Sequence, residues 1–557
     1  MKRGKTRNAA RLGILLIALM LLSGLIGSSP QAAQPWKVSS VDLVGADGAN
    51  NTTAFVNDRY IMVAPYAPSK MPTEAAAVDE LDNYSIYLVD MKKPSDGLQS
   101  HVIESQVDHK RLYYPTKLVF DDKTSIVYVR GTRYEKTDDG VKEIAALAYM
   151  HVNLDVYGKP TFDDDVVIFD IAGVGEATTP DAPDDLRLVF GGDLLLFTNG
   201  ASVFTYNVNH GYLYRVDLVK AEAYDAGARI AYLDVDEATR TLSVYWNQQV
   251  QEKETVKNHT ELSFYDLSGD GTMQLQKRLY PEDFPEGVYI TAGSSIEVLA
   301  PITVNNNFIR PALVATSDGS LFQVDLNSTE RAASLKRLVQ FDAMATGSEG
   351  GPRILKLDIS KRMAGIVRQG YTAQIRKPAN GRPGKGGSVI RTLSLFNSVE
   401  PPALAIARFN KGMNKVLASK VFSDDFRGED GLTPLIDGQD SQWMLATRSG
   451  KVLALSTTDA TESLGLSVLT QIGSRTGRID YSASRDSVVA INSYGLDAAA
   501  EQIAEPGELL VARRLGSAVQ NVSTASAATV TSTVSPSERG GQSPTPSIRR
   551  PCNISKK

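Results

Sequence analysis

The stretch Leu313-Val-Ala-Thr-Ser-Asp-Gly-Ser-Leu-Phe-Gln-Val-Asp-Leu326 decides the fold. Two short apolar runs flank a Ser-Asp-Gly turn, and Asp and Gly tolerate the positive φ that a tight turn needs. In the second run Phe322, Val324 and Leu326 fall on one face of an extended chain, with polar residues between them. This alternation around an Asp-Gly pair predicts a β-hairpin.

The same hairpin pattern recurs later in the chain, in the stretch Leu445-Ala-Thr-Arg-Ser-Gly-Lys-Val-Leu-Ala-Leu455. There Thr447 and Gly450 match Thr316 and Gly319 of the first copy. A hairpin that repeats along a long chain indicates a repeat architecture, in which each unit buries its apolar face against the next.

Other strand pairs follow related patterns. Residues 195–206 are a looser copy of the hairpin, and residues 118–129 read as strand, acidic turn, strand. Residues 232–245 repeat this second type, with Asp236 at the position of Asp121. Long helical periodicity is nearly absent, so the pattern of short strands and turns predicts an all-β chain.

The repeats predict a β-propeller over residues 36–516. They amount to about seven or eight four-stranded units spaced about 60 residues apart, longer than compact propeller repeats, so long loops should project from the blades. Stacked sandwiches are the less favoured alternative. Ring closure would remove exposed sheet edges, and residues 38–44 beside residues 508–512 are the expected closing pair.

The hairpins at 314–326 and 445–455 resemble the repeat of quinoprotein-type β-propellers. The resemblance covers these two units well and implies a propeller of eight or so blades. The Thr-Gly-Lys and Trp that follow each hairpin in that family are replaced by Asn327-Ser-Thr and Ser456-Thr-Thr. The chain also holds only 3 Trp and 1 Cys. The resemblance therefore implies a cofactor-free branch, similar to scaffold and assembly propellers of the bacterial envelope.

Both ends of the chain differ in composition from the middle. A basic start is followed by an apolar run over residues 12–26, which has the length of a signal-peptide core and is short for a membrane span. We therefore expect a signal peptide over residues 1–33 and a secreted, periplasmic or cell-surface protein. An uncleaved segment would be the only membrane contact. From residue 517 to 557 a Ser/Thr/Pro-rich tail predicts disorder.

Composition argues against several classes of function. The formal net charge of −5 disfavours nucleic acid as the main partner. The single Cys552 allows no intramolecular disulfide and no cysteine metal site. No Gly-x-Ser-x-Gly motif occurs, and none of the histidines has a His partner at metal-ligand spacing, since they are scattered singly as His101, His109, His151, His210 and His259.

One short segment has the ligand spacing of a calcium loop. Asp266, Ser268 and Asp270 alternate as oxygen donors, and Gly271 permits a sharp turn. Lys277 stands where a standard loop has its bidentate Glu. The alternative interpretation is a type I′ hairpin turn that uses Asp and Gly for backbone reasons. Calcium is the only cofactor that the sequence suggests.

A basic run without intervening acids extends from Lys361 to Arg391. Such a run can form a patch for an anionic polymer or a protein partner, and a solvated Gly/Pro-rich loop is the alternative. Its candidate partner-binding residues are Arg368, Arg376, Lys377, Arg382, Lys385 and Arg391. An acidic region from Asp155 to Asp185 gives the chain charge asymmetry.

These features predict an exported, non-enzymatic propeller that acts as a protein-interaction or scaffold module. The first alternative is a carbohydrate-active propeller enzyme with an acidic pair in its central cavity, where two carboxylates about 5–9 Å apart would support hydrolysis. A calcium-stabilised adhesion propeller is the second alternative. It would require further calcium loops in other blades.

Overall fold

The computed structural model describes most of the chain between Trp36 and Arg514. The described residues are 36–43, 52–64, 85–93, 99–113, 115–173, 186–218, 229–252, 255–286, 288, 290, 296–298, 301–304, 307–329, 335–340, 353–361, 366–369, 372–375, 389–397, 403–409, 416–426, 433–434, 442–457, 464–472, 476–481, 487–492 and 507–514. The predicted signal peptide (1–33) and the predicted disordered tail (517–557) lie outside these residues.

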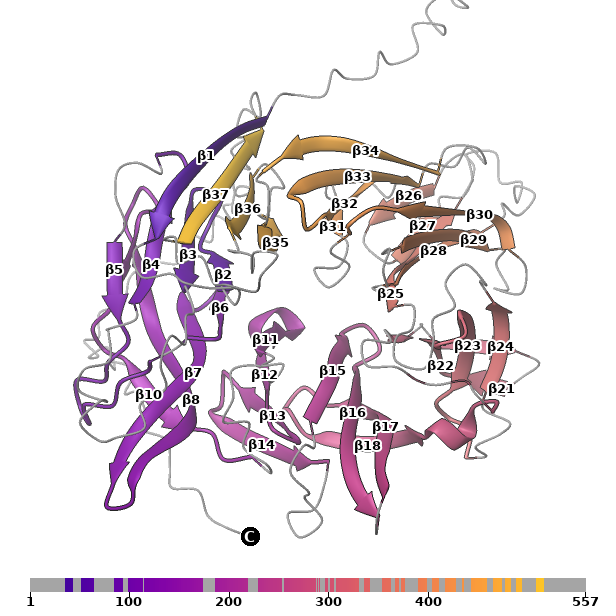
Figure 1. Cartoon of the computed structure of the whole chain (residues 1–557), viewed down its shortest axis with the longest axis horizontal. Helices are drawn as coiled ribbons and strands as arrows, with labels where there is room; N and C mark the ends of the chain where they lie inside the picture. Colours follow the sequence, from indigo (N-terminus) through magenta and orange to yellow (C-terminus); the bar gives the residue numbers. More distant parts are fainter. Residues whose placement is uncertain are drawn as a thin grey trace, which may run out of the picture.

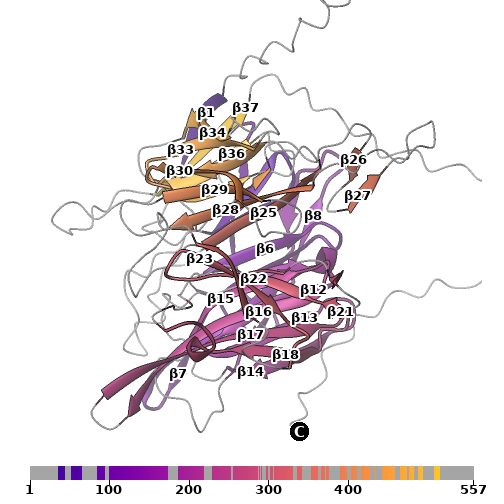
Figure 2. The same ribbon diagram turned by 90° about the vertical axis from the view of Figure 1, so that its right-hand side faces the viewer.

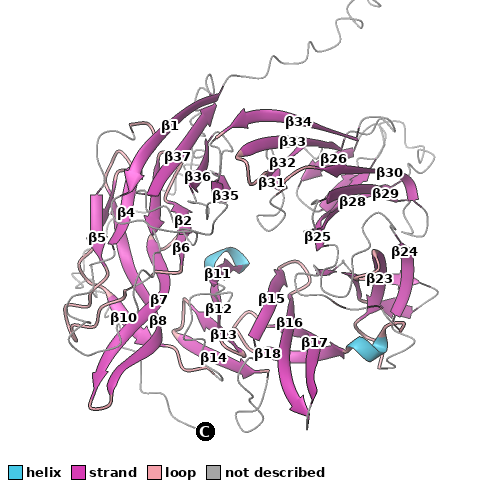
Figure 3. Ribbon diagram, in the orientation of Figure 1, coloured by secondary structure: helices cyan, strands magenta, loops and turns pink. Residues whose placement is uncertain are grey.

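Across the described residues, eight antiparallel sheets of at least four strands stand side by side around a central axis (Figure 1). Strands dominate the fold, and the described helical segments are the short 3-10 turns η2 (Phe190–Gly192) and η4 (Pro281–Asp283) (Figure 3). None of the helical segments described is long and apolar enough to cross a membrane. The described chain is therefore an all-β β-propeller of eight blades, and the repeats had predicted a β-propeller of about seven or eight.

The first four blades follow one another along the chain. Blade 1 holds β2 (Thr52–Phe55), β3 (Tyr60–Ala64), β4 (Ser85–Asp90) and β5 (Gln99–Val102). Blade 2 holds β6 (Lys117–Asp121), β7 (Ile126–Thr137), β8 (Gly140–Leu154), β9 (Pro160–Phe162) and β10 (Val167–Asp170). Blade 3 holds β11 (Leu186–Val189), β12 (Leu194–Asn199), β13 (Ser202–Asn207) and β14 (Tyr212–Asp217). Blade 4 holds β15 (Arg229–Asp236), β16 (Thr241–Glu252), β17 (Thr255–Leu267) and β18 (Met273–Leu279).

The next two blades carry an extra hairpin between their first and second strands. Blade 5 holds β19 (Ile296–Val298), β22 (Pro311–Ala315), β23 (Ser320–Asp325) and β24 (Leu335–Gln340), with the hairpin β20 (Ile302–Val304) and β21 (Asn307–Ile309) inserted. Blade 6 holds β25 (Arg353–Lys361), β28 (Val389–Asn397), β29 (Ala403–Phe409) and β30 (Val416–Ser423), with the hairpin β26 (Ile366–Gln369) and β27 (Thr372–Ile375) inserted.

The last two blades complete the ring. Blade 7 holds β31 (Thr433–Pro434), β32 (Gln442–Ala446), β33 (Lys451–Thr457) and β34 (Leu464–Gln471). Blade 8 holds β35 (Thr476–Tyr481), β36 (Ser487–Asn492) and β37 (Gly507–Arg514), and takes its outer strand, β1 (Trp36–Leu43), from the other end of the described chain.

The ring is closed by the pairing of β1 with β37. The two strands are antiparallel, and their register runs from Trp36 opposite Arg514 to Leu43 opposite Gly507. This is the closing pair that the sequence predicted. Because closure joins the ends of the chain within one sheet, it gives the edge of β37 a partner.

Apolar cores lie between neighbouring blades. Seven described clusters each join residues of two adjacent blades. On β12, Leu194 and Leu196 pack toward blade 4, while Leu195 and Phe197 pack toward blade 2. Phe322, Val324 and Leu326 share one cluster, which confirms the face predicted for them. The inner-blade strands are buried on both faces, so their sequences are continuously apolar.

The turns that matched in the sequence have the same geometry. In blade 5 the Gly319 N–H donates to the Thr316 carbonyl (3.0 Å), and in blade 7 the Gly450 N–H donates to the Thr447 carbonyl (3.0 Å). The two glycines have φ of 74° and 79°. Only glycine adopts this left-handed region at little cost, which explains the repeated Gly.

The acidic turns of blades 2 and 4 also match. Asp121 accepts a hydrogen bond from the hydroxyl of Thr124 (2.6 Å), and Asp236 accepts one from the hydroxyl of Thr239 (2.7 Å). Each Asp ends the first strand of its blade. The Asp-x-x-Thr spacing therefore closes the turn into the second strand, because the carboxylate satisfies groups that the ladder leaves without partners.

The ring has two faces that differ in their connections. Consecutive strands of a blade are antiparallel, so the first-to-second and third-to-fourth connections lie on one face and the second-to-third connections on the other. We call the face that carries the first-to-second and third-to-fourth connections the insertion face, because both extra hairpins lie on it. In the side view β26 and β27 stand out on that side, while β7 reaches toward the opposite side (Figure 2).

Candidate functional site

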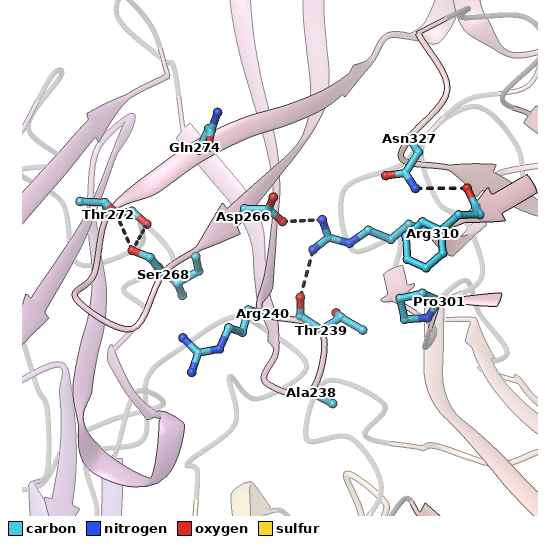
Figure 4. Close-up of a pocket in the computed structure, with 12 residues that line it drawn as sticks. Ala238, Thr239, Arg240, Asp266, Ser268, Thr272, Gln274, Pro301, Arg310 and Asn327 are labelled. Carbon is cyan, nitrogen blue, oxygen red and sulfur yellow. Dashed lines mark hydrogen bonds and ion pairs between the residues drawn. The ribbon is translucent and has the colours of Figure 1, made fainter. Parts of the chain in front are cut away.

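A cavity of about 550 Å³ opens on the insertion face between blades 4 and 5. Figure 4 shows most of its walls. Turns and strand ends of blade 4 supply one side, and the inserted segment of blade 5 supplies the other. The lining residues are Ala238, Thr239, Arg240, Asp266, Leu267, Ser268, Thr272, Gln274, Pro301, Phe308, Arg310 and Asn327.

Arg310 joins the two sides of the cavity. It lies between β21 and β22, and its side chain is 13% exposed. An Nη1 group is 2.5 Å from the Asp266 carboxylate, and Nη2 donates to the Thr239 carbonyl (3.0 Å) and the Thr241 hydroxyl (2.7 Å). A planar guanidinium can serve these acceptors together. Arg310 therefore fixes the inserted segment of blade 5 against blade 4.

Asp325 and Asn327 hold the rim of the cavity on the blade 5 side. The Asp325 carboxylate accepts hydrogen bonds from the backbone N–H of Arg310 (3.3 Å) and of Asn327 (3.1 Å). The side-chain amide of Asn327 donates to the carbonyl of Phe308 (3.4 Å). The bond from Asn327 holds the backbone of Phe308, although the residue stays 62% exposed.

Arg240 lies at the other end of the cavity, on the Ser268 side in Figure 4. Its guanidinium carbon is 5.0 Å from the centroid of the Phe190 ring in blade 3, a cation–π contact. A Cβ atom at Gly269 would come within 3.0 Å of Arg240 Nη1, so the glycine leaves room for the guanidinium. The Arg240 side chain is exposed.

Of the candidate calcium residues, Asp266 lies near the end of β17, and Ser268 and Asp270 lie in the turn between β17 and β18. Asp266 is bound to Arg310, while Ser268 donates to Asp270 and the Thr272 N–H donates to Asp270 (3.0 Å). The Ser268 hydroxyl and the Thr272 groups hold the pKa of Asp270 below its ordinary value. The turn spans five residues between paired Leu267 and Met273.

The turn between β17 and β18 is longer than the two-residue type I′ turn that the sequence offered as the alternative. Asp270 is hydrogen-bonded within this turn, and Asp266 forms the ion pair with Arg310. Gly271 has a φ of 103°, as the sequence led us to expect. No group of three or more His, Cys, Asp or Glu side chains that could hold a metal occurs among the described residues. The calcium site stays a prediction.

The candidate partner-binding residues belong to the first-to-second connection of blade 6. Arg368 is in β26, opposite Ala373, and Arg391 is in β28, opposite Ile359. The other four lie outside the described residues: Arg376, Lys377, Arg382 and Lys385. The run therefore begins and ends on strands that border the insertion face.

Two described carboxylates of the innermost strands bear on the hydrolase alternative. Asp234 on β15 is 3.1 Å from Arg187 Nη1, and Asp480 on β35 accepts a hydrogen bond from Thr53. Both contacts join neighbouring blades. In the cavity between blades 4 and 5, Asp266 is the acidic lining residue, and it is bound to Arg310.

The acidic region divides between the two faces. Asp155, Asp163, Asp164 and Asp165 lie in the third-to-fourth connection of blade 2, on the insertion face. Asp170 ends β10 on the other side and binds the Arg133 guanidinium through both oxygens at 2.8 Å. The other acids of the region, Glu176, Asp181, Asp184 and Asp185, lie outside the described residues.

Sequence patterns did not single out Phe308, Arg310 or Asn327. Phe308 lies in β21 of the inserted hairpin, Arg310 follows that strand, and Asn327 follows β23. The one local signal is an aromatic residue at the end of the polar run Asn305-Asn306-Asn307. The role of Arg310 depends on contacts with Thr239 and Asp266 in another blade, which local sequence does not encode. Asn327 meets Phe308 within its own blade, but the two residues are far enough apart along the chain to share no local pattern.

No protein-family model matches this sequence, and no curated protein matches it. Solved structures do match. The Dos1 propeller is 12% identical, with 86% of this chain and 94% of that chain covered and a TM-score of 0.41. A europium-containing methanol dehydrogenase is 10% identical, with 87% and 94% covered and a TM-score of 0.43. A quinohemoprotein alcohol dehydrogenase from Pseudomonas putida HK5 is 10% identical, with 91% and 78% covered and a TM-score of 0.40.

At such identities and TM-scores, no residue role transfers to this chain. The propeller fold follows from the strand pairing of the chain itself. The cofactor-free branch stays a prediction.

Proposed function

We propose that this chain is an exported, non-catalytic β-propeller that acts as a binding module through its insertion face. The observation that carries the proposal is the pair of extra hairpins, β20–β21 and β26–β27, in the same connection of two consecutive blades. Connections carry function when a rigid scaffold positions them, and here one hairpin contributes to the wall of a cavity while the other lies within the basic run.

The electrostatics in and beside the cavity between blades 4 and 5 support binding over catalysis. Asp266 in the cavity is held by Arg310, and Asp270 is held within its own turn. A general acid or base needs a carboxylate that can reach substrate. The N-terminal sequence supports export, since its apolar run has the length of a signal-peptide core.

The partner of this module is a protein or an anionic polymer of the envelope, bound with the help of the basic run. Six cations within a short connection provide attraction for a negatively charged surface. The attraction weakens as salt rises, because exposed charges are screened within about 8–10 Å at physiological ionic strength.

Affinity capture from the native envelope and secretome tests this function. The full chain is compared with a variant in which Arg368, Arg376, Lys377, Arg382, Lys385 and Arg391 are replaced by Gln. We expect the wild-type chain to retain a partner that the variant loses. The charge-matched control should retain the partner. In it, six exposed lysines outside the run are also replaced by Gln: Lys92, Lys93, Lys136, Lys142, Lys336 and Lys420.

Two results would count against the proposal. Capture of no partner at any salt concentration would remove the scaffold function and favour the hydrolase alternative. Equal loss of the partner in the charge-matched control would show that net charge, and not the basic run, determines binding.

A further inference from the structure

We infer that the cavity between blades 4 and 5 binds an acidic oligosaccharide, one whose sugar rings carry carboxylate groups. This inference rests on the proposed binding function and names a ligand class for the insertion face. The cavity would bind the sugar without hydrolysing it.

The charge of the cavity wall favours an anionic ligand. Two arginines and one aspartate line it. Arg310 and Asp266 form an ion pair at 2.5 Å, and Arg310 is further bound to the turn of blade 4. Arg240 remains exposed. Its guanidinium presents a fork of donors that matches a carboxylate.

Two further acids near Arg240 are engaged in their own backbone contacts. Glu237 accepts a hydrogen bond from the Phe190 N–H (3.0 Å), and Asp270 accepts one from the Thr272 N–H (3.0 Å). Neither residue lines the cavity. Among the side chains that line the cavity, two arginines stand against one aspartate, so the lining itself carries an excess of positive charge. Arg240 carries that excess, and its contact with the Phe190 ring helps to orient it.

The aromatic wall favours a sugar ring over a purely ionic group. Phe308 is 62% exposed even though its backbone is held by Asn327. Pro301 lines the cavity beside it. Ligand pockets are commonly lined by aromatic side chains beside a few polar groups. The C–H face of a pyranose packs well against such a ring, because its hydrogens meet the electron-rich π face.

Amide side chains supply the remaining recognition. Asn327 and Gln274 line the cavity and are exposed. Amides both donate and accept hydrogen bonds, so they suit sugar hydroxyls, which do the same. The volume of about 550 Å³ is within the range of ligand pockets, roughly 300–1,000 Å³.

The arrangement of these groups favours more than one sugar ring. In Figure 4, Arg240 extends toward Ser268, while Arg310, Pro301 and Asn327 lie on the opposite side of Asp266. A ligand that contacts the guanidinium of Arg240 and the blade 5 wall must therefore bridge the cavity. An oligosaccharide with a carboxylate on one ring and a neighbouring ring on Phe308 does so.

Calorimetry on the full chain tests the inference with three acidic probes, tri-galacturonate, tri-mannuronate and a hyaluronan tetrasaccharide, and with neutral galactotriose. We expect at least one acidic probe to bind with a dissociation constant below about 1 mM and at least about tenfold more tightly than galactotriose. Phe308→Ala and Arg240→Gln should each weaken that binding by about tenfold or more.

Matched variants separate the site from general effects. Tyr212→Ala removes the ring of a residue that is 59% exposed on β14 and does not line the cavity. Arg337→Gln removes an exposed arginine that lies 5.3 Å over the Phe322 ring in blade 5 and does not line the cavity. Both should bind the acidic probe as the wild-type chain does.

Three results would overturn the inference. They are no binding of any acidic probe, binding of galactotriose with equal affinity, and unchanged binding in both cavity variants. If the probes fail while a protein partner is still captured through the basic run, the ligand class is wrong and the binding function stands. If both fail, the binding function itself is wrong.

Discussion

Arg310 shows how one side chain holds two blades together. Its guanidinium reaches Asp266, the Thr239 carbonyl and the Thr241 hydroxyl, all of blade 4, although the residue belongs to blade 5. The side chain is 13% exposed and the Asp266 carboxylate is 40% exposed. Partial burial strengthens these contacts relative to an ion pair in open solvent.

We expect Arg310→Ala to lower the free energy of unfolding by about 2 kcal/mol. The substitution removes the hydrogen bonds that Arg310 donates to blade 4 and leaves the Asp266 carboxylate without this cation. Urea unfolding followed by tryptophan fluorescence measures the loss. As a control, Lys110→Ala breaks a local ion pair with Asp108 whose side chains are 33% and 44% exposed, and should cost less than about 1 kcal/mol. Equal losses would contradict a linking role for Arg310.

Glu143 lies on β8, opposite Tyr134 on β7. Burial raises the pKa of its carboxyl group from 4.5 to about 7. In the unfolded chain the carboxyl group ionises at its ordinary pKa. Between the two values the folded protein therefore binds more protons than the unfolded chain, so stability falls as pH rises through this window.

Glu143→Gln removes this titration and should make stability less dependent on pH. Relative to wild type, we expect the variant to gain about 1 kcal/mol at about pH 8 and nothing at about pH 4, with the gain reduced by solvent screening at a half-exposed group. Thermal unfolding at both pH values measures the difference. The same gain at both values would contradict the role of the carboxyl charge.

At the scale of elements, blades 5 and 7 each contain the same hydrogen bond. In each blade a glutamine at the end of the fourth strand donates to the turn between the second and third strands. The side-chain amide of Gln340, at the end of β24, donates to the carbonyl of Asp318 (3.3 Å). Gln471, at the end of β34, donates to the carbonyl of Ser449 (2.5 Å). In each blade the glutamine closes the matching turn between the second and third strands, which adds a third repeated position to Thr and Gly.

Replacing either glutamine by alanine should destabilise the fold by about 0.5–1 kcal/mol, because the exposed turn carbonyl loses its protein donor and water replaces it in part. We further expect faster amide hydrogen exchange at Gly319 or Gly450 in the affected turn. Gln276→Ala, at an exposed position of β18, is the control and should leave both quantities unchanged. A loss of the same size in the control would show that the contact has no specific role.

At the scale of the whole molecule, closure by β1 determines whether the ring is complete. Without β1, the outer edge of β37 would be exposed, and apolar contacts of Val41 and Trp36 with the flanking clusters would be lost. Because neighbouring blades share their cores, opening at one blade weakens both neighbours.

We expect a chain that begins at residue 44 to lose cooperative unfolding and to aggregate, since an open sheet edge pairs readily with other chains. A chain that begins at residue 36 keeps β1 and is the matched control. Urea unfolding and size-exclusion chromatography compare the two. A peptide of residues 34–45 added to the shorter chain should restore cooperative unfolding. Equal stability of the two chains would contradict closure by β1.

Several features of the fold could be predicted because their signals are local. The matching Thr-x-x-Gly turns at Gly319 and Gly450 follow from backbone conformations that few residues adopt. Period-two alternation placed Phe322, Val324 and Leu326 on one face. The closing pair of β1 and β37 was predictable because a ring of strands needs a partner for its last edge.

The candidate site was less accessible to sequence reasoning. Asp266 was identified, but as a calcium ligand, because the spacing with Ser268 and Asp270 fits an oxygen-donor loop. Its contact with Arg310 joins residues in different blades, and no local period relates them. The exposed side chain of Phe308 indicates a binding site only because it lines one cavity together with Arg240 and Asn327. The fold brings these three residues together.

The sequence by itself determined the all-β class, the repeated turns and the pairing that closes the ring, because strand alternation and turn chemistry act over a few residues. Only the tertiary structure decided that there are eight blades across the described chain, that the extra hairpins share one face and that Arg310 meets Asp266. These features depend on how neighbouring sheets pack, and packing joins residues whose separation along the chain leaves no pattern in the sequence.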